Sequence, residues 1–474
     1  MSVSEYASYF KSHYKRTSSF VSGTALMIVD AAMIMLSIGA GFFVINLVNN
    51  DWINFRSFIT YSIYLPVILI VFYAASLYPG ILLAPQEEVK RFSLCSFFSF
   101  LGIAVSINVE GSDQRFPIAL ALVVSWPFAT LLLPVGREVA KHIFAHFDWW
   151  GVPAVLFSKG TSAKVIADRL IRRPYYGYSP ALIISDMENP PEDYLGVPIF
   201  ERSDELDSLI KKLNIKVAIL CDYNHQIEKL QTNYRYIVRV PKRQNSINMS
   251  LHMRDFGGIL GFSSTNYLTK KSPLFLKRLI DVAICLAVAP VLLPIVLIIA
   301  LAIKLDSPGP VFYGHTRVGR NRKPIKCWKF RSMGTDSQEQ LKHILATDPV
   351  RAAEWEKDRK FTDDPRVTKV GRILRKTSLD ELPQLWNIFT GEMSFVGPRP
   401  VTEPELVKYG DYADYVLTVK PGLSGMWQIS GRSDTGYEER ITLDTYYIQN
   451  WSIWLDIWII IKTVWVVFRG KGAY

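Results

Sequence analysis

Cysteine is scarce and widely spaced in this chain, which excludes two common kinds of site. The 474 residues include four cysteines, and no two of them have the C-x-x-C spacing of a zinc site. Their scatter does not suggest a disulfide framework, and free thiols fit a reducing cytosol. They are Cys95, Cys221, Cys285 and Cys327. We therefore expect neither a zinc protein nor a disulfide-stabilised secreted domain.

Acidic residues are outnumbered: 43 Asp and Glu stand against 54 Lys and Arg, giving a formal net charge of +11. Such a surplus is typical of proteins that bind nucleic acid, an anionic membrane surface or a phosphorylated substrate. The basic, aromatic stretch from 304 to 331 directly follows a long apolar run. That position favours an acidic lipid at the bilayer, and we expect no nucleic acid partner.

Long apolar runs are abundant, and the mean hydropathy is +0.14. Four runs in the first 135 residues approach the length of about 20 residues that a helix needs to cross a bilayer. They cover roughly 21–47, 57–78, 92–109 and 116–135. Basic residues before run one, between runs two and three and after run four place both ends in the cytoplasm. We predict a four-helix transmembrane domain over 1–150.

Asp30 lies inside the first apolar run. An acid within a membrane segment is a candidate functional residue. No partner base is visible in the sequence, so a packing or helix-contact role is favoured.

Residues 151–265 have a different texture, with short apolar runs such as "PAVLF" and "VAILCD" separated by helical patterns. Alternating strands and helices indicate a parallel sheet. The first turn, "FSKGTSAK", has one glycine where a dinucleotide fingerprint has three. We predict a Rossmann-like cytosolic domain without a cofactor. A folded spacer or oligomerisation domain is the alternative, and we expect a homodimer.

Residues 282–303 form a further uncharged apolar run, flanked by basic residues on both sides. Both flanks therefore look cytoplasmic under the positive-inside rule. Ala289-Pro290 and Pro294 fall in mid-run, where proline removes helix hydrogen bonds and bends the axis. We predict a re-entrant membrane helix over 266–304 that enters and leaves one leaflet. A kinked ordinary span is the alternative.

The segment "TSLDELPQLWNIF" places two adjacent acids, Asp380 and Glu381, at the start of a predicted helix that Gly391 ends. Pro383 fits the first turn, which favours Asp380 as the N-cap. A helix cap with an acidic first turn is the plainer interpretation. Arginines, prolines and glycines around the pair are instead the parts of a phosphate site. The candidate phosphate ligands from this pattern are Arg372, Arg375, Arg399, Lys420, Gln428 and Arg432. One acid could attack phosphorus while the other holds Mg²⁺.

Five segments resemble the bacterial sugar transferase family, the monotopic phosphoglycosyl transferases. They are "FLKRLIDVAICLAVAPVLLP", "GPVFYGHTRVGRNRKPIKCWKFRSM", "GRILRKTSLDELPQLWNIFTGEMSFVGPRP", "KPGLSGMWQISGR" and "DTYYIQNWSIWLDIWIIIKT". The match spans the last 200 residues or so. With the amino-terminal spans and the Rossmann-like middle, the chain is similar to the large members, the polyprenyl-phosphate hexose-1-phosphate transferases. One departure is Ala289-Pro290, where the family often has Ser-Pro.

The resemblance implies a two-step reaction. A hexose-1-phosphate, expected to be galactose-1-phosphate, passes from a UDP-sugar to undecaprenyl phosphate with release of UMP, in the first membrane step of O-antigen, capsule or exopolysaccharide synthesis. Asp380 would be the nucleophile that forms an aspartyl-phosphosugar intermediate, and Glu381 the Mg²⁺ ligand. Matched to the family's motifs, Lys329, Arg331, Arg375, Arg399 and Gln428 would bind phosphate or nucleotide.

The implied architecture is a transmembrane bundle, an α/β domain, the re-entrant helix and a mostly helical catalytic domain over 305–474. That domain would face the cytoplasm at the bacterial inner membrane and end in an interfacial helix over 451–468, for which core packing is the alternative. A glucose-1-phosphate transferase, a transporter and a non-catalytic scaffold are the other functions considered.

Overall fold

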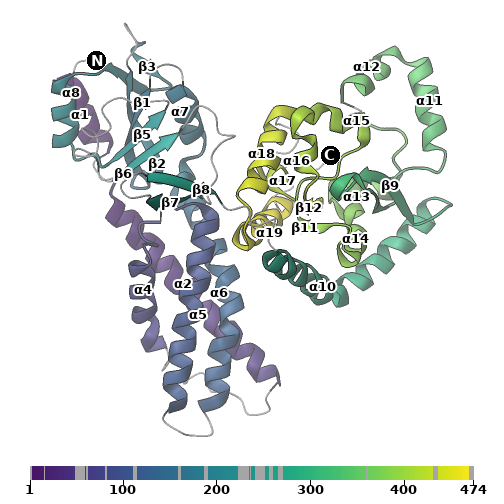
Figure 1. Cartoon of the computed structure of the whole chain (residues 1–474), viewed down its shortest axis with the longest axis horizontal. Coiled ribbons are helices and arrows are strands. Elements are labelled where there is room, and N and C mark those ends of the chain that lie inside the picture. Colours follow the sequence, from purple (N-terminus) through teal and green to yellow (C-terminus); the bar gives the residue numbers. More distant parts are fainter. Residues whose placement is uncertain are drawn as a thin grey trace. The chain divides into compact units, whose positions relative to one another are not determined.

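The computed structural model divides the chain into two compact units, Met1–Ser246 and Ile247–Tyr474. It describes residues 3–14, 17–48, 59, 62–80, 83–109, 115–158, 162–185, 191–221, 234, 236–240, 251–255, 260–264, 271–358, 361, 363–430 and 436–468. The first unit holds apolar helices and a mixed α/β sheet (Figure 1). The second holds a long apolar helix and a set of mostly short helices and strands.

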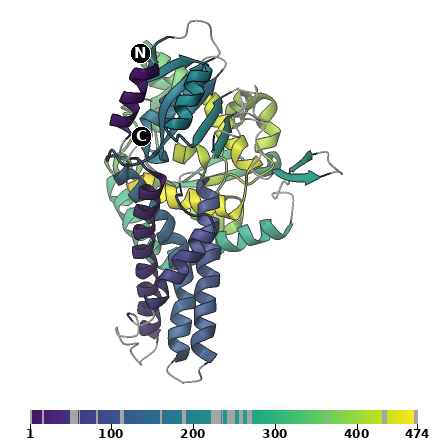
Figure 2. The same cartoon turned by 90° about the vertical axis from the view of Figure 1, so that its left-hand side faces the viewer.

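Apolar helices form a bundle in the first unit, as Figures 1 and 2 show. They are α2 (Ser19–Val48), the 3₁₀ turn η1 (Ser62–Tyr64), α4 (Leu65–Ala74), α5 (Pro85–Val109) and α6 (Arg115–Phe144). Side chains from α2, α4, α5 and α6 share one core that includes Ile34, Phe72, Phe92 and Leu122. Three of these helices, α2, α5 and α6, are long and apolar enough to cross a membrane.

The outer faces of the bundle are apolar. Ile28, Phe98 and Phe116 are each more than 60% exposed. Large apolar side chains at the surface of every long helix fit lipid and not water. The second predicted run is different, because its described helical part, Ser62–Ala74, is shorter than a span, and most of the run before Ser62 lies outside the described residues.

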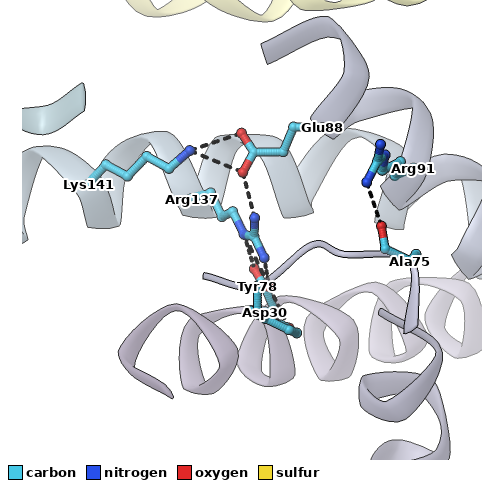
Figure 3. Close-up of polar contacts among 7 residues, drawn as sticks. All are labelled: Asp30, Ala75, Tyr78, Glu88, Arg91, Arg137 and Lys141. Carbon is cyan, nitrogen blue, oxygen red and sulfur yellow. Dashed lines mark hydrogen bonds and ion pairs between the residues drawn. The ribbon is translucent and has the colours of Figure 1, made fainter. Parts of the chain in front are cut away.

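Asp30 has a partner that the sequence did not reveal (Figure 3). The Arg137 guanidinium, from α6, donates from Nη2 to Asp30 Oδ2 at 2.7 Å and from Nη1 to Glu88 Oε1 at 2.6 Å. Lys141 Nζ lies 3.0 Å from both Glu88 oxygens, and the Tyr78 hydroxyl donates to Asp30 Oδ2 at 2.7 Å. Two acids and two bases from α2, α5 and α6 thus neutralise one another inside the bundle. This is the packing role expected for Asp30.

The sheet of the first unit has the strand order β3-β4-β2-β1-β5-β6, in which only β3 runs antiparallel to its neighbour. Its strands are β1 (Val152–Ser158), β2 (Tyr178–Ser185), β3 (Asp193–Tyr194), β4 (Val197–Glu201), β5 (Val217–Cys221) and β6 (Tyr236–Val240). Helix α7 (Ser162–Arg172) packs on one face, and α8 (Asp204–Lys212) on the other. The 3₁₀ turn η2 (Pro174–Tyr176) precedes β2.

Helix α1 (Val3–His13) belongs to the α/β core, although sequence analysis grouped it with the membrane helices. Tyr6 and Phe10 are buried against the sheet face that α8 covers, and the Tyr6 hydroxyl donates to Ala181 O at 3.1 Å. The amino terminus therefore ties the two parts of this unit together.

Helix α10 (Lys271–Asp306) is the long apolar helix of the second unit, and it follows the hairpin of β7 (Leu251–Asp255) and β8 (Leu260–Ser264). Pro290 and Pro294 lie inside it, and Figure 1 shows two arms that meet at a bend. Prolines at mid-helix remove backbone hydrogen bonds, which accounts for a bend there. Only 11% of its most apolar stretch is buried. An exposed surface of this kind fits a lipid environment.

The remaining elements of this unit follow in chain order. They are β9 (Phe312–Val318), η5 (Arg320–Arg322), β10 (Pro324–Phe330), α11 (Ser337–Thr347), α12 (Pro349–Asp358), α13 (Lys369–Lys376), η6 (Leu379–Glu381), α14 (Gln384–Thr390), β11 (Ser394–Val396), α15 (Glu403–Leu406), η7 (Val407–Tyr412), α16 (Ala413–Val416), β12 (Gly422–Ser424), α17 (Met426–Ser430), α18 (Tyr437–Gln449) and α19 (Ile453–Phe468).

The first arm of α10 is fastened to this domain by charged side chains. Lys277 Nζ pairs with Asp456 Oδ2 of α19 at 2.5 Å, so neither residue is a free surface charge. Asp281 accepts hydrogen bonds from Ser394 Oγ and the Phe395 N–H, both at 3.1 Å. Leu455 and Ile459 of α19 are also buried. One face of the terminal helix therefore packs in the core, as the alternative interpretation of 451–468 predicted.

Candidate active site

The acidic pair lies in a 3₁₀ turn, η6, and not at the start of an α-helix. The predicted N-cap role of Asp380 is wrong, because α14 begins at Gln384 with Pro383 as its N-cap. Ser378, with φ of +56°, takes the left-handed conformation and turns the chain between α13 and η6. Gly391 ends α14 with φ of +86°, as predicted. Asp380 is thus presented from a tight turn, with its side chain largely buried.

The cation opposite the pair comes from the β9–β10 hairpin. Lys329 faces Tyr313 across the hairpin, and His315 faces Cys327. Side chains alternate between the two faces of a strand, and directly opposed residues share a face. Lys329 and His315 therefore lie on the same face. Lys329 Nζ is 2.7 Å from Glu381 Oε1 and 3.5 Å from Asp380 Oδ2.

Arg399 reaches the same carboxylate from the loop "VGPRP". Its Nη2 lies 3.3 Å from Glu381 Oε1. The loop follows β11, which pairs in parallel with β12. Gly397 is tightly packed in this loop, because a Cβ atom at this position would lie 2.6 Å from Lys420 O. The absence of a side chain at Gly397 lets the backbone approach closely. The loop's second proline, Pro400, and Arg399 both line a small cavity beside Glu381.

The two acids have different electrostatic environments. Burial tends to raise the pKa of Glu381, but Arg399 and Lys329 outweigh it and lower this pKa to about 2. Burial raises the pKa of Asp380, and the more distant Lys329 offsets this only in part. Glu381 is therefore a firmly ionised, doubly paired carboxylate. Asp380 receives one long contact among those seen in the described residues.

Asn387, which sequence analysis did not single out, fixes α14 to the hairpin. Its fully buried side chain accepts from Trp328 N at 3.0 Å and donates to Lys326 O at 2.8 Å and Glu392 Oε2 at 2.7 Å. These two backbone contacts fall just before Lys329. The asparagine therefore joins α14 to the strand that carries Lys329.

Other predicted ligands are partly brought together. Burial lowers the pKa of Arg375, and the nearby charge of Asp380 opposes this only in part. The Arg375 Nε donates to Ser332 Oγ at 3.0 Å. Arg331 is buried and donates to Pro308 O and Ser307 O, both at 2.7 Å, so it braces the exit of α10. Arg372 is exposed on α13.

Two of the ligands predicted from "KPGLSGMWQISGR", Lys420 and Gln428, lie within the described residues. Lys420 is near Gly391 and Arg278, at the far end of α14 from the acids. Burial lowers the pKa of Lys420, and the positive charge of Arg278 lowers it further. Gln428 is buried in α17. Arg432 lies outside the described residues.

Three residues that sequence analysis missed line the cavity with Lys329 and Glu381: His315, Arg317 and Gln384. The strand alternation from Lys329, combined with a hairpin register, could have found the first two. Arg440 of α18 contacts the backbone of Arg399, because its Nη2 donates to Arg399 O at 3.4 Å. Its guanidinium carbon lies 4.8 Å from the centre of the Trp427 ring. No local signal marks Arg440.

The acids suit Mg²⁺ in part. Carboxylate oxygens are ligands that Mg²⁺ prefers, and it is commonly held by one or two of them together with phosphates and waters. The described residues contain no group of three or more His, Cys, Asp or Glu that could hold a metal. Glu381 could hold an ion whose other ligands would come from a bound phosphate and from water.

Comparison with known proteins identifies the family of this chain. Residues 272–470 match the family model described as bacterial sugar transferase. The chain is also 36% identical over 398 residues to the Undecaprenyl-phosphate galactose phosphotransferase of Salmonella typhimurium, covering 82% of each chain. The chain belongs to the bacterial sugar transferase family.

Two further relatives match less than half of this sugar transferase. The Exopolysaccharide production protein ExoY of Sinorhizobium fredii is 47% identical over 198 residues, which are 42% of this chain and 88% of that protein. The UDP-glucose:undecaprenyl-phosphate glucose-1-phosphate transferase of Escherichia coli K12 is 43% identical over 207 residues, 42% of this chain and 41% of that protein.

Proposed function

We propose that this sugar transferase moves galactose-1-phosphate from UDP-galactose to undecaprenyl phosphate and releases UMP, through an intermediate on Asp380. Its membership of the family, and relatives whose names state hexose phosphate transfer to undecaprenyl phosphate, make it a phosphoglycosyl transferase that starts polysaccharide synthesis. Galactose is favoured by the relative that matches 82% of the chain, whereas the glucose-specific relative matches 42%.

The assignment of Asp380 as the nucleophile rests on the different ion pairs of the two acids. Glu381 is engaged by Lys329 at 2.7 Å and Arg399 at 3.3 Å, while Asp380 has only the 3.5 Å contact with Lys329 among the described residues. A carboxylate with two close cations is a weaker nucleophile than one with a single long contact, because the cations stabilise its ionised form. Asp380 keeps electron density for attack on phosphorus.

The reaction balances in two displacements. An Asp380 oxygen attacks the phosphorus that carries the sugar, the bond to the bridging oxygen of the diphosphate breaks, and UMP leaves with that oxygen. A phosphate oxygen of undecaprenyl phosphate then attacks the same phosphorus and frees the carboxylate. Lys329, Arg375 and Arg399 would neutralise the charge on the transferred phosphoryl group. Bound Mg²⁺, held by Glu381 and substrate phosphates, would add to this neutralisation.

Trapping of the intermediate tests this function. Purified wild type, incubated with UDP-galactose labelled in the sugar and no lipid acceptor, should retain label on the protein and release UMP. Asp380→Asn keeps the size of the side chain but should do neither, because an amide cannot readily form the acyl phosphate. Label on Asp380→Asn comparable to wild type would place the nucleophile elsewhere. UMP release from a panel of UDP-sugars tests the choice of galactose.

We also propose that α10 is re-entrant, with both ends at the cytoplasmic face of the inner membrane and the catalytic domain on that side. The proline bend and the basic residues on both flanks support this. Lys277 is a poor probe because it is ion-paired, but Ser272 and Lys304 are exposed. Cysteines placed at these two positions should both react with an impermeant reagent from the cytoplasmic side only. Labelling from opposite sides would show an ordinary span.

A further inference from the structure

A histidine lies in the cavity of the acidic site, although the proposed chemistry needs no imidazole. His315 of β9 lines this cavity together with Lys329, Glu381 and Arg399. It shares the hairpin face of Lys329, so its position follows from strand alternation and register. No step of the proposed transfer uses it.

One nitrogen of this ring is committed to the backbone. His315 Nδ1 lies 3.0 Å from Thr316 O. A carbonyl oxygen can only accept a hydrogen bond, so Nδ1 must carry the proton. In the neutral ring the other nitrogen, Nε2, is then a hydrogen-bond acceptor with a free lone pair.

The surroundings keep the ring neutral. The pKa of His315 is lowered by burial first and by Arg317 second. The hydrogen bond to Thr316 O opposes this, Lys329 lowers the pKa further and Glu405 raises it, and the net shift is downward. Arg399 also lines the same cavity. An acceptor nitrogen among cations is a poor partner for phosphate, whose oxygens are also acceptors. It is a good partner for a hydroxyl group, which can donate.

We propose that His315 binds a hydroxyl group of the UDP-sugar through Nε2 and thereby contributes to donor specificity, while the cations beside it take the phosphates. This inference rests on the proposed function, since it names a contact to that donor. The hydroxyl could belong to the hexose or to the ribose, because both offer the same chemistry. A site that pairs with a donor hydroxyl discriminates against analogues that lack it.

Two substitutions separate this role from a purely structural one. His315→Gln can place an amide oxygen near the position of Nε2 but removes the Nδ1 contact. His315→Asn can keep a donor near the position of Nδ1 but has no atom at the Nε2 position. Loss of one neutral hydrogen bond should reduce kcat/KM by about tenfold in His315→Asn, whereas His315→Gln should stay close to wild type.

Single-deoxy analogues of the preferred UDP-hexose identify the hydroxyl. The analogues lack in turn each hexose hydroxyl or the ribose 2′- or 3′-hydroxyl, and kcat/KM for UMP release is measured with each. For one analogue wild type should lose about tenfold and His315→Asn should lose nothing further, because the contact is already absent. Which analogue behaves so distinguishes a hexose contact from a ribose contact.

His343→Gln is the matched control, because His343 is an exposed histidine on α11 and does not line the cavity. It should match wild type on every donor. The proposal is overturned if His315→Asn and wild type lose activity in parallel on all analogues, or if His315→Asn behaves as wild type while His315→Gln is impaired. Absence of UMP release by wild type from every UDP-hexose would instead refute the proposed function.

Discussion

Replacing Arg137 by methionine should strongly destabilise the N-terminal unit. The Arg137 side chain is 1% exposed and that of Asp30 is 0% exposed, so the pair is shielded from solvent. Glu88 would keep Lys141, at 3.0 Å, after the substitution. Asp30 would keep only the Tyr78 hydroxyl among the contacts that Figure 3 draws. The substitution therefore leaves the buried Asp30 carboxylate without a cationic partner among those contacts.

The size of the effect follows from that count. Breaking a buried ion pair by removing one partner costs about 3 to 5 kcal/mol, because the charge that remains is not compensated. For a unit of this size each kcal/mol shifts the midpoint by roughly 2–4 °C, so we expect a decrease on the order of 10 °C. Asp30→Asn should be milder, since Arg137 would still contact Glu88 at 2.6 Å.

Thermal unfolding in detergent micelles measures this difference, with the double variant Arg137→Met, Asp30→Asn as the key sample. Removing both charges leaves no stranded carboxylate, so the double variant should be more stable than Arg137→Met alone. Lys90→Met is a suitable control, because Lys90 forms a half-exposed surface pair with Glu87 and should contribute little. An Arg137→Met midpoint within 1–2 °C of wild type, or a double variant as unstable as the sum of the single changes, would refute the reasoning.

The remaining predictions concern the catalytic unit. Glu381→Gln should lower the rate of UMP release, and added Mg²⁺ should restore part of it by mass action, as a titration of rate against Mg²⁺ would show; an unchanged Mg²⁺ dependence would contradict a metal role. Activity should fall as the pH decreases through the pKa of Asp380. Because burial raises that pKa, the fall should lie above the ordinary aspartate range. In a pH–rate profile, Lys329→Met should move the fall to still higher pH, and a shift to lower pH would contradict the pairing. Asn387→Leu should reduce kcat about tenfold or more with a smaller change in KM, because it removes the hydrogen bonds between α14 and the hairpin. Steady-state kinetics would measure both constants, and an unchanged kcat would exclude a positioning role. A fragment from Ser272 onward should retain transfer activity in detergent, since the family match covers residues 272–470 and a match of 198 residues spans 88% of the ExoY relative; a folded but inert fragment would show that the first unit is needed for chemistry.

Local patterns in the sequence were enough for several elements. The apolar runs predicted α2, α5 and α6, because a helix in lipid must be apolar over most of its length. The glycine at 391 predicted the end of α14, since its left-handed conformation is costly for other residues. Mid-run prolines predicted the bend of α10. The local pattern of charges, prolines and glycines indicated the acidic pair and Arg399, and the motif resemblance added Lys329. The structure brings these four residues together.

Contacts between distant residues were decided only by the tertiary structure. Arg137 is 107 residues from Asp30, and Asn387 is 61 residues from Lys326, so no local pattern links either pair. The same holds for Arg331, whose sequence position resembled that of a phosphate ligand but whose guanidinium turns to Ser307 and Pro308. Composition and spacing fix which groups a segment carries and which way a regular element turns them. The partner of each charge depends on how elements far apart in the chain pack, because burial and distance set the strength of every one of these interactions.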